Sequence, residues 1–225
     1  MIETCIIIPV YNEGNQISSV LDGLSTQKYL IVVVDDGSTD NSCDIIQSYN
    51  VHLLRHLVNL GQGAALMTGI KYALTVPELK YIITFDSDGQ HQSSDIPKLV
   101  DALAKEKCDV ALGSRFIVGA NAENITALRR ITLKLALFTT RLTTGLKITD
   151  THNGLRAFTV EAAAKIKITQ NRMAHASEIL QQISKFKLSY CEVPVNVLYT
   201  QYSKSKGQSL VSAIDIILDI IRGRL

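Results

Sequence analysis

Two carboxylates, Asp86 and Asp88, stand directly after a short apolar run, residues 81–85, that is typical of a buried strand. In an open α/β sheet, ligands bind just beyond the carboxyl ends of the strands. Two acidic side chains two residues apart suit a hard divalent cation, which takes oxygen ligands and often binds substrate phosphates as well. The segment therefore indicates a metal-dependent enzyme acting on a phosphorylated substrate. The alternative is a solvated turn, because Asp, Ser and Gly all favour turns.

A second polar cluster, Tyr11, Asn12 and Glu13, follows the first apolar run of the chain. The ring of Tyr11 could stack on a nucleotide base, and the carboxylate of Glu13 could accept a hydrogen bond from a base or a ribose. The alternative is an ordinary strand-to-helix turn in which Asn12 caps the helix.

Two further loops carry residues suited to a nucleotide. Asp35 and Asp36 follow a β-branched run, where a carboxylate of a nucleotide-binding fold commonly bonds the ribose or base. The glycines of residues 59–63 allow either a close backbone approach to a ligand or a tight entry into a helix. This loop is not a Walker loop, because the Gly-Lys-Ser/Thr ending is missing, and it is not a G-x-G-x-x-G loop either.

Near-continuous apolar strands alternate with helix-like segments in the first half of the chain. We predict strands at Thr4–Pro9, Leu30–Val34, His52–Arg55, Tyr81–Phe85 and Val110–Gly113. This alternation predicts an α/β, Rossmann-like fold with a mostly parallel central sheet and helices on both faces. For the second half we predict a loop at Ile117–Asn124, helices at Leu128–Leu146, Val160–Ile166, Ala174–Phe186 and Val211–Ile221, a turn at Thr149–Gly154 and a strand at Ser189–Leu198.

Composition excludes some classes of function. The 225 residues carry a formal net charge of +2, so there is no global electrostatic case for nucleic-acid binding. The four cysteines include no C-x-x-C pair, and we expect free thiols in a reducing compartment and not a disulfide framework. The start of the chain does not read as a signal peptide. No apolar stretch reaches the roughly 18–20 residues of a transmembrane helix.

The motifs IIIPVYNE, VVVDDGSTD, NLGQGAALMTG and FDSDGQH follow one another along the chain. Their order and separations resemble those of family 2 glycosyltransferases, which have the GT-A fold. The tripeptide at 113–115 and the Asp150-x-x-x-Gly154-x-Arg156 pattern resemble the polyprenyl-phosphate branch, typified by dolichol-phosphate mannose synthases. The resemblance covers essentially the whole chain. It implies one domain, 1–225, with a nucleotide-sugar-binding half at 1–115 and an acceptor-side half at 116–225.

The resemblance also implies roles for individual residues. Positions that hold the nucleotide are matched by Pro9, Tyr11, Glu13, Val34, Asp36, Asp86 and Ser87. Among them, Asp86 matches the residue that contacts the ribose. Asp88 and Gln90 match the ligands of Mg²⁺ or Mn²⁺, and Arg115 matches a basic residue near the diphosphate and the acceptor phosphate. The donor is then a UDP- or GDP-linked sugar, and the anomeric configuration inverts in one in-line displacement.

The acceptor decides whether a general base is needed. A polyprenyl phosphate is already anionic at neutral pH, so positioning does most of the catalytic work. A hydroxyl group of a glycan, as in polysaccharide or O-antigen synthesis, needs a carboxylate base, for which Asp150 and Glu178 are the candidates. Each has a structural alternative, since Asp150 could cap a turn and Glu178 could be a solvated helix residue.

Departures from the family pattern concern mainly the acceptor side. Gln62 stands where the third motif often carries a basic residue, and Thr200 stands where the polyprenyl branch usually has an arginine. Lys204 or Lys206 could supply that charge, although an ammonium group is not equivalent to a planar guanidinium. Further candidates for contacts to the acceptor or to phosphate are Arg129, Arg130 and Arg156.

Two segments have an amphipathic pattern. Residues 128–148 mix apolar side chains with five cations and predict a basic helix that either lies in a membrane interface or packs on the sheet. Residues 209–225 predict a second helix, whose wide apolar face needs the core, a membrane or another subunit. We therefore expect a cytoplasmic protein, peripheral on the cytoplasmic face of a membrane or a homo-oligomer.

Two other classes of protein share part of this pattern. A nucleotidylyltransferase would favour a Gly-rich loop with Arg or Lys after the first strand, which residues 11–13 do not supply. A non-catalytic sugar-nucleotide-binding protein would not need the intact pair of Asp86 and Asp88. We therefore favour the glycosyltransferase.

Overall fold

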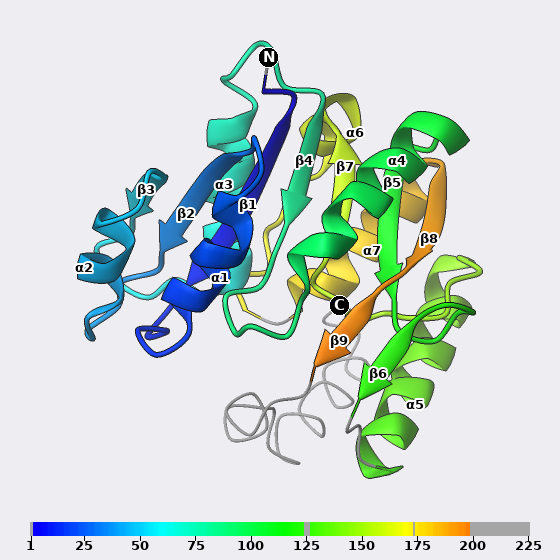
Figure 1. Ribbon diagram of the computed structural model, residues 1–225. Helices are drawn as coiled ribbons and strands as arrows, with labels where there is room; N and C mark the ends of the chain where they lie inside the picture. Colours follow the sequence, from blue (N-terminus) through cyan, green and yellow to red (C-terminus); the bar gives the residue numbers. More distant parts are fainter. Residues whose placement is uncertain (1, 124–126, 173, 199–225) are drawn as a thin grey trace.

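The computed structural model describes residues 2–123, 127–172 and 174–198, which are built around a sheet of seven strands (Figure 1). The strands lie in the order β3-β2-β1-β4-β7-β5-β8, and a separate two-stranded sheet joins β6 to β9. Paired strands are parallel except at β7, which runs antiparallel to both β4 and β5. The predicted mostly parallel sheet is therefore confirmed.

The central strands are buried on both faces, which explains their near-continuous apolar sequences. The strands of the large sheet are β1 (Thr4–Val10), β2 (Leu30–Asp35), β3 (His52–Arg55), β4 (Tyr81–Thr84), β5 (Val110–Ser114), β7 (Arg156–Thr159) and β8 (Tyr190–Pro194). The small sheet pairs β6 (Asn121–Glu123) with β9 (Asn196–Leu198). All seven residues of β1 are buried, because β2 and β4 flank it in the sheet.

Helices cover both faces of the large sheet (Figure 1). They are α1 (Ile17–Ser25), α2 (Ser42–Gln47), α3 (Gln62–Ala73), α4 (Ile96–Glu106), α5 (Ala127–Thr144), α6 (Val160–Lys165) and α7 (His175–Lys185). One core cluster joins α1, α2 and α4 to one face of the sheet, and a second joins α3, α6 and α7 to the other face. Helix α5 packs against α7, and so lies outside the central layers.

Sequence patterns located most elements of the fold. All five strands predicted in the first half are present, and so are the helices predicted at 128–146, 160–166 and 174–186. The loop prediction at 117–124 is wrong in part, because that segment contains β6. The single strand predicted at 189–198 is two strands, β8 and β9, which separate at Val195 and join different sheets. The helix predicted at Val211–Ile221 lies outside the described residues.

The expectation of free thiols is wrong for two of the four cysteines. Cys108 and Cys191 form a disulfide, with their Cα atoms 6.3 Å apart. Parallel pairing of β5 with β8 brings these residues together across 83 positions of sequence. Sequence spacing does not reveal such a pairing, since connectivity depends on the fold. Cys5 and Cys43 are free and buried.

None of the helices in the described part of the chain combines the length and the apolar character that a membrane span requires.

Candidate active site

The polar clusters that follow β1, β2, β4 and β5 all lie at the carboxyl edge of the sheet, because these strands run in the same direction. Two further segments complete this edge. One is the first turn of helix α3, and the other is the turn formed by residues 149–154 before β7. The site is therefore assembled at the position where open α/β sheets bind ligands.

Asp86 is held from three directions. The side-chain amide of Gln62 donates a hydrogen bond to its Oδ1 over 2.9 Å, and the Nε2 atom of His91 lies 3.0 Å from its Oδ2. Gly154 lies against the carboxylate so closely that a Cβ atom at this position would overlap it. Burial alone would raise the pKa of Asp86, but the hydrogen bond and positive charge of His91 lower it below its usual value. Asp86 is therefore an ionised acceptor.

Asp88 and Gln90 bring oxygen-bearing groups to one place after β4. The backbone N–H of Gln90 donates to Asp88 Oδ1 over 3.0 Å, and the Gln90 amide lies 2.5 Å from Asp88 Oδ2. Burial, followed by the negative charge of Asp86, raises the pKa of Asp88 above its usual value. In the described part of the chain, no lysine or arginine forms an ion pair with this carboxylate.

These groups fit a hard divalent cation. A half-turn of the Gln90 amide would present its oxygen beside the carboxylate of Asp88, and the two orientations of an amide differ only in its hydrogen bonds. A cation would also offset the charge that disfavours ionised Asp88. Within the described residues, no three acidic, histidine or cysteine side chains converge as a metal site. Mg²⁺ often takes only one or two carboxylates from a protein and completes its shell with water and substrate phosphates, and the pair formed by Asp88 and Gln90 would suit that mode of binding.

The other predicted nucleotide residues line the same edge in different ways. Pro9 and Val34 are paired in register within β1 and β2, and both are buried, so their backbones are the parts available to a ligand. Tyr11 is 44% exposed, whereas Glu13 and Ser87 are buried. The tyrosine ring is therefore the group in this set that is free to meet a base from solvent.

Asn12 does not cap α1. Its Oδ1 accepts a hydrogen bond from the backbone of Thr39 over 2.8 Å, and its own N–H donates to Ser38. These bonds join the loop after β1 to the loop after β2. The capping alternative for Asn12 is therefore wrong, and the residue serves to connect two loops of the site.

Asp36 is engaged with its own protein. Its Oδ1 lies 2.7 Å from Nδ1 of His56 and accepts the backbone N–H of Leu60, while its Oδ2 accepts the N–H of Gly61 over 2.7 Å. These bonds fold the loop between β3 and α3 against the end of β2. Asp36 therefore shapes the loop that delivers Gln62 to the site.

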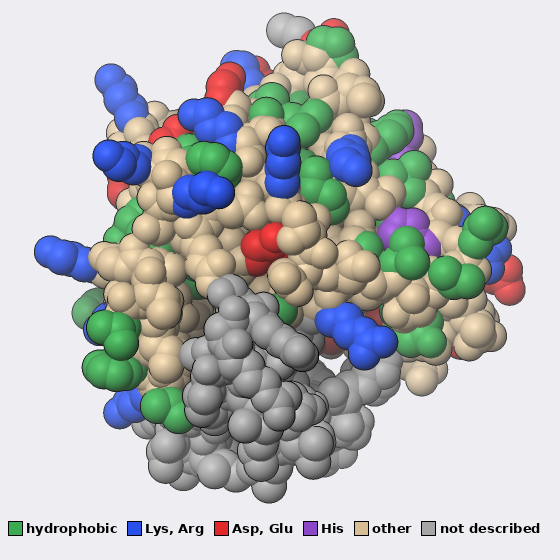
Figure 2. All heavy atoms as spheres, turned by 180° about the vertical axis from the view of Figure 1, so that it is seen from behind, with side chains coloured by type: hydrophobic (Ala, Val, Ile, Leu, Met, Phe, Trp, Pro, Cys, Tyr) green, Lys and Arg blue, Asp and Glu red, His purple; other side chains and the backbone are tan. Residues whose placement is uncertain are grey.

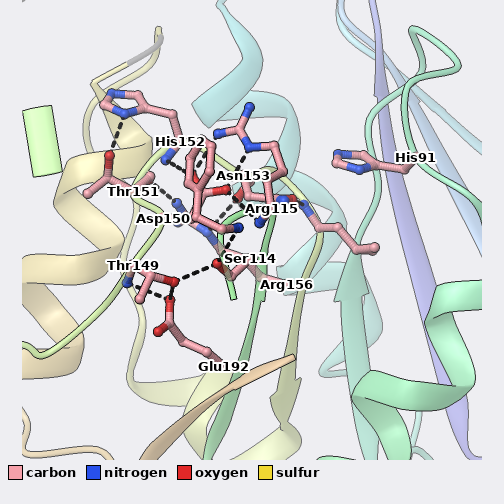
Figure 3. A network of polar contacts seen from close by, with 12 residues as sticks. His91, Ser114, Arg115, Thr149, Asp150, Thr151, His152, Asn153, Arg156 and Glu192 are labelled. Carbon is pink, nitrogen blue, oxygen red and sulfur yellow. Dashed lines mark hydrogen bonds and ion pairs between the residues drawn. The ribbon is translucent and has the colours of Figure 1, made fainter. Parts of the chain in front are cut away.

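Arg115 and Asp150 form a buried ion pair (Figure 3). The Nε and Nη2 atoms of Arg115 each donate to a different oxygen of Asp150 over 2.6 Å, and the Arg115 N–H donates to Asp150 Oδ2 as well. Burial alone would raise the pKa of Asp150, but the bonds and charge of Arg115 lower it. An anionic carboxylate that is bound in this way is a poor general base.

A second set of contacts fixes the residues next to that pair. The hydroxyl groups of Ser114 and Thr149 lie 2.6 Å apart, and Glu192 of β8 accepts both the backbone N–H and the hydroxyl of Thr149 (Figure 3). The end of β5 is thereby tied to the 149–154 turn and to the edge strand. The position of Arg115 is therefore set from three parts of the chain.

Arg156 and Glu178 have roles that differ from those expected. The guanidinium of Arg156 is buried and donates to the carbonyl groups of Thr151, Asn153 and Ala176, so it braces the turn from inside. The contact of Arg156 with an acceptor stays a prediction. The carboxylate of Glu178 accepts hydrogen bonds from residues 169–170, including the Thr169 hydroxyl over 2.6 Å. These bonds hold the loop before α7 against the helix.

The remaining predicted contacts are described only in part. Arg129 and Arg130 lie in the first turns of α5. Lys204 and Lys206 lie outside the described residues. His91, in the loop after β4, is 8% exposed and faces Asp86.

Comparisons with known proteins show the family to which the chain belongs. The chain matches the family described as Glycosyl transferase family 2 over residues 5–167. An uncharacterized protein of Methanocaldococcus jannaschii is 38% identical, over 99% of this chain and 93% of that protein. The UDP-N-acetylglucosamine–dolichyl-phosphate N-acetylglucosaminyltransferase of Methanococcus voltae is 31% identical, over 94% of this chain and 92% of the relative.

Solved structures show the same fold. The glucosyl-3-phosphoglycerate synthase of Mycobacterium tuberculosis, in complex with Mn²⁺, UDP and glucosyl-3-phosphoglycerate, superposes with a TM-score of 0.73 at 17% identity, over 99% of this chain and 79% of that one. The family match, the named relatives and the shared fold together define a glycosyltransferase with a GT-A-like fold. The chain belongs to glycosyl transferase family 2, and its relatives include enzymes named for transfer of sugars to dolichyl phosphate.

Proposed function

We propose that the protein is an inverting glycosyltransferase that moves a sugar from a nucleotide-sugar to a polyprenyl phosphate. In this proposal, residues 1–115 bind the donor and residues 116–225 bind the acceptor. Relatives named as dolichyl-phosphate glycosyltransferases support the choice of acceptor class. The observation that carries it is a pocket beside the Arg115–Asp150 pair.

This pocket has a volume of about 420 Å³ and combines apolar walls with cations. It is lined by Phe116, Leu133, Lys134, Leu137, Arg141 and Thr149. Phe116 and Thr149 are the chain neighbours of Arg115 and Asp150, so the pocket adjoins the buried ion pair. An apolar cavity with a few placed polar groups is typical of a small-molecule site. An anionic lipid fits it, because the isoprenoid chain meets the apolar walls and the phosphate meets Arg141 and Lys134.

The state of the two candidate bases also favours a phosphate acceptor over a glycan hydroxyl. Asp150 is ion-paired and its pKa is lowered, and Glu178 is occupied by residues 169–170. A sugar hydroxyl would need one of them to accept its proton. A phosphate oxygen needs no deprotonation, so this site has only to position it in line with the donor.

On the donor side, the chain's own residues bind and orient the nucleotide. Tyr11 would stack on the base, Asp86 would accept a hydrogen bond from the ribose, and Asp88 with Gln90 would hold Mg²⁺ or Mn²⁺. Such a cation, when bound, offsets the charge that develops on the departing nucleoside diphosphate. Structural relatives with bound UDP and Mn²⁺ or Mg²⁺ support this choice of cation.

Helix α5 supports a place at a membrane surface. Its outer side carries Leu135, Phe138 and Leu142, which are 47%, 65% and 76% exposed and lie three and four residues apart. At 3.6 residues per turn, these three face away from the side that packs on the protein, where Thr140 is buried. A helix that is apolar on its outer side as well needs a second partner.

The charge of α5 supports an anionic lipid surface as that partner. The helix sequence, ALRRITLKLALFTTRLTT, contains basic residues and no acidic ones. Basic amphipathic helices of this kind lie in the interface of membranes that carry anionic lipids. Figure 2 shows hydrophobic and basic side chains next to one another on the side of the molecule that α5 occupies. Lys134 and Arg141 also line the pocket, so a helix docked in this way would bring the pocket close to the lipid surface.

Filling the pocket tests the acceptor site. Leu133→Trp is expected to raise the KM for a short-chain polyprenyl phosphate about tenfold, because a ring in the cavity excludes the chain, while the KM for the donor stays the same. The matched control is Leu135→Trp, the same change two residues along on the outer side of α5. Equal acceptor KM values for the two variants would contradict the assignment of the pocket.

Removing apolar surface from the outer side of α5 tests membrane docking. Leu142→Asp is expected to weaken binding to vesicles of phosphatidylglycerol and phosphatidylcholine about tenfold, because it replaces buried apolar area with charge. Leu57→Asp is the control, since Leu57 is 100% exposed but lies in the loop after β3. Co-sedimentation of both variants to the same extent as the parent protein would rule out this surface.

A further inference from the structure

The carboxylate of Asp86 receives one hydrogen bond on each oxygen from two distant parts of the chain. Gln62, at the start of α3, donates to Oδ1 over 2.9 Å. His91, in the loop after β4, lies with Nε2 3.0 Å from Oδ2. Since the carboxylate only accepts, Nε2 is the donor in this hydrogen bond. Each oxygen of the carboxylate is thus held by one hydrogen bond.

His91 makes this bond at a cost to the fold. Its side chain is 4% exposed, and its Nδ1 atom is one of two buried side-chain polar atoms without a partner within the described part of the chain. An unpartnered buried polar atom is unfavourable, so an apolar side chain would suit the same space better. Phe85 already supplies an aromatic contact to the ring, with centroids 5.6 Å apart. The feature that distinguishes histidine here is the bond from Nε2 to Asp86.

The third side of the carboxylate is closed by backbone. Gly154 lies against Asp86, and its carbonyl group accepts a hydrogen bond from the Thr84 hydroxyl over 2.7 Å. The carboxylate therefore has no room to rotate toward the 149–154 turn. The hydrogen bonds from Gln62 and His91 therefore fix the orientation of the Asp86 carboxylate.

An ionised carboxylate has about four lone-pair positions, two on each oxygen. With one position on each oxygen taken, one on each oxygen is left. This pattern matches two neighbouring hydroxyl groups, such as the 2′ and 3′ hydroxyl groups of a ribose. We propose that Gln62 and His91 are positioning residues that fix Asp86 so that both its oxygens accept from the ribose diol of the donor. We call the contacts of Gln62 and His91 with Asp86 the clamp. The clamp rests on the proposed function, in which Asp86 binds that ribose.

The test measures nucleotide affinity in a pair of matched variants. His91→Gln keeps a nitrogen close to the place of Nε2, whereas His91→Asn ends short of it. Calorimetry with uridine diphosphate and then guanosine diphosphate, each with Mn²⁺, is expected to show about tenfold weaker binding for His91→Asn. His91→Gln is expected to stay within about twofold of the parent protein, because it restores the donor. Gln62→Met, at a half-buried helix start, removes the other donor with little change of volume and is expected to weaken binding as well.

A 2′,3′-dideoxy nucleotide separates positioning from a purely structural effect. It lacks the diol, so the parent protein is expected to bind it about tenfold more weakly than the ribonucleotide, and His91→Asn and Gln62→Met are expected to lose that preference. Folded variants that bind the ribonucleotide as tightly as the parent, or that keep its full preference, would overturn the clamp while leaving the donor site in place. Failure of the parent protein to bind either diphosphate would overturn the proposed donor site together with the clamp.

Discussion

Asp88→Ala is expected to reduce sugar transfer about a thousandfold or more while the protein stays folded. Asp88 and Gln90 are the oxygen-bearing pair beyond β4 that fits a divalent cation. Loss of a bound cation removes several kcal/mol of charge stabilisation from the departing diphosphate, and each 1.36 kcal/mol corresponds to a factor of ten in rate. The rate of nucleoside diphosphate release at saturating donor and acceptor measures the loss.

The stability of an Asp88 variant separates a functional residue from a structural one. Burial, and then the charge of Asp86, raises the pKa of Asp88, so its ionised form is less favourable in the folded protein than in the unfolded chain. A raised pKa contributes stability only at acid pH, and that contribution is lost as the pH rises through the folded value. At pH 7 without added metal, Asp88→Asn is therefore expected to melt at the same temperature as the parent protein or higher. A folded Asp88→Ala variant with near-normal turnover would refute the metal site.

Asp150→Asn is expected to destabilise the protein by about 3–5 kcal/mol and to reduce transfer sharply. Removing one partner of a buried ion pair leaves the other charge buried and uncompensated. Here Arg115 would keep its position beside a neutral amide that cannot accept both of its N–H groups. The midpoint of urea denaturation, followed by circular dichroism, measures the change.

The matched control is Asp101→Asn, the same substitution in an exposed pair. Lys105 and Asp101 are separated by 2.6 Å, but their side chains are 74% and 61% exposed, and such surface pairs contribute only about 0.3–0.5 kcal/mol. Equal denaturation midpoints for the two variants would contradict a buried pair at Arg115. A variant of Asp150 with full stability and a shifted pH–rate profile would restore Asp150 as a general base.

The Arg115–Asp150 pair also predicts how the stability of the protein changes at acid pH. The pKa of Asp150 is lowered from its ordinary value of 3.8 in the folded protein, so its contribution to stability is fully present above that value. The contribution is lost as the pH falls through the lower folded value. The stability gap between the parent protein and Asp150→Asn is therefore expected to be constant near neutral pH and to narrow below about pH 4.

The fold was largely predictable because its signals are local. The strands β1, β2 and β4 are apolar runs bounded by turn residues, and the helices between them have apolar residues at three- and four-residue spacing. Two strands were not predicted for physical reasons. β7 has only four residues, Arg156–Thr159, and begins with a buried arginine. β6 has three residues and depends on pairing with β9, a contact between distant parts of the chain.

The residues of the candidate site also fall into those that local sequence located and those that depend on distant contacts. Asp86 and Asp88 could be located from the sequence, because they follow a strand directly. The roles of His91 and Thr149 depend on contacts with other elements, and nothing near them in sequence indicates those contacts. Glu178 shows the converse case, since an acid in the first turn of a helix is consistent with either a base or a residue that holds a loop.

The most direct test of the central proposal is turnover of a panel of UDP- and GDP-linked sugars with Mg²⁺ or Mn²⁺, with and without a short-chain polyprenyl phosphate. We expect nucleoside diphosphate release from one donor that depends on both the metal and the lipid phosphate, together with a glycolipid product of inverted anomeric configuration. Release that requires a glycan with a free hydroxyl, and that is unaffected by the lipid phosphate, would contradict the proposed acceptor.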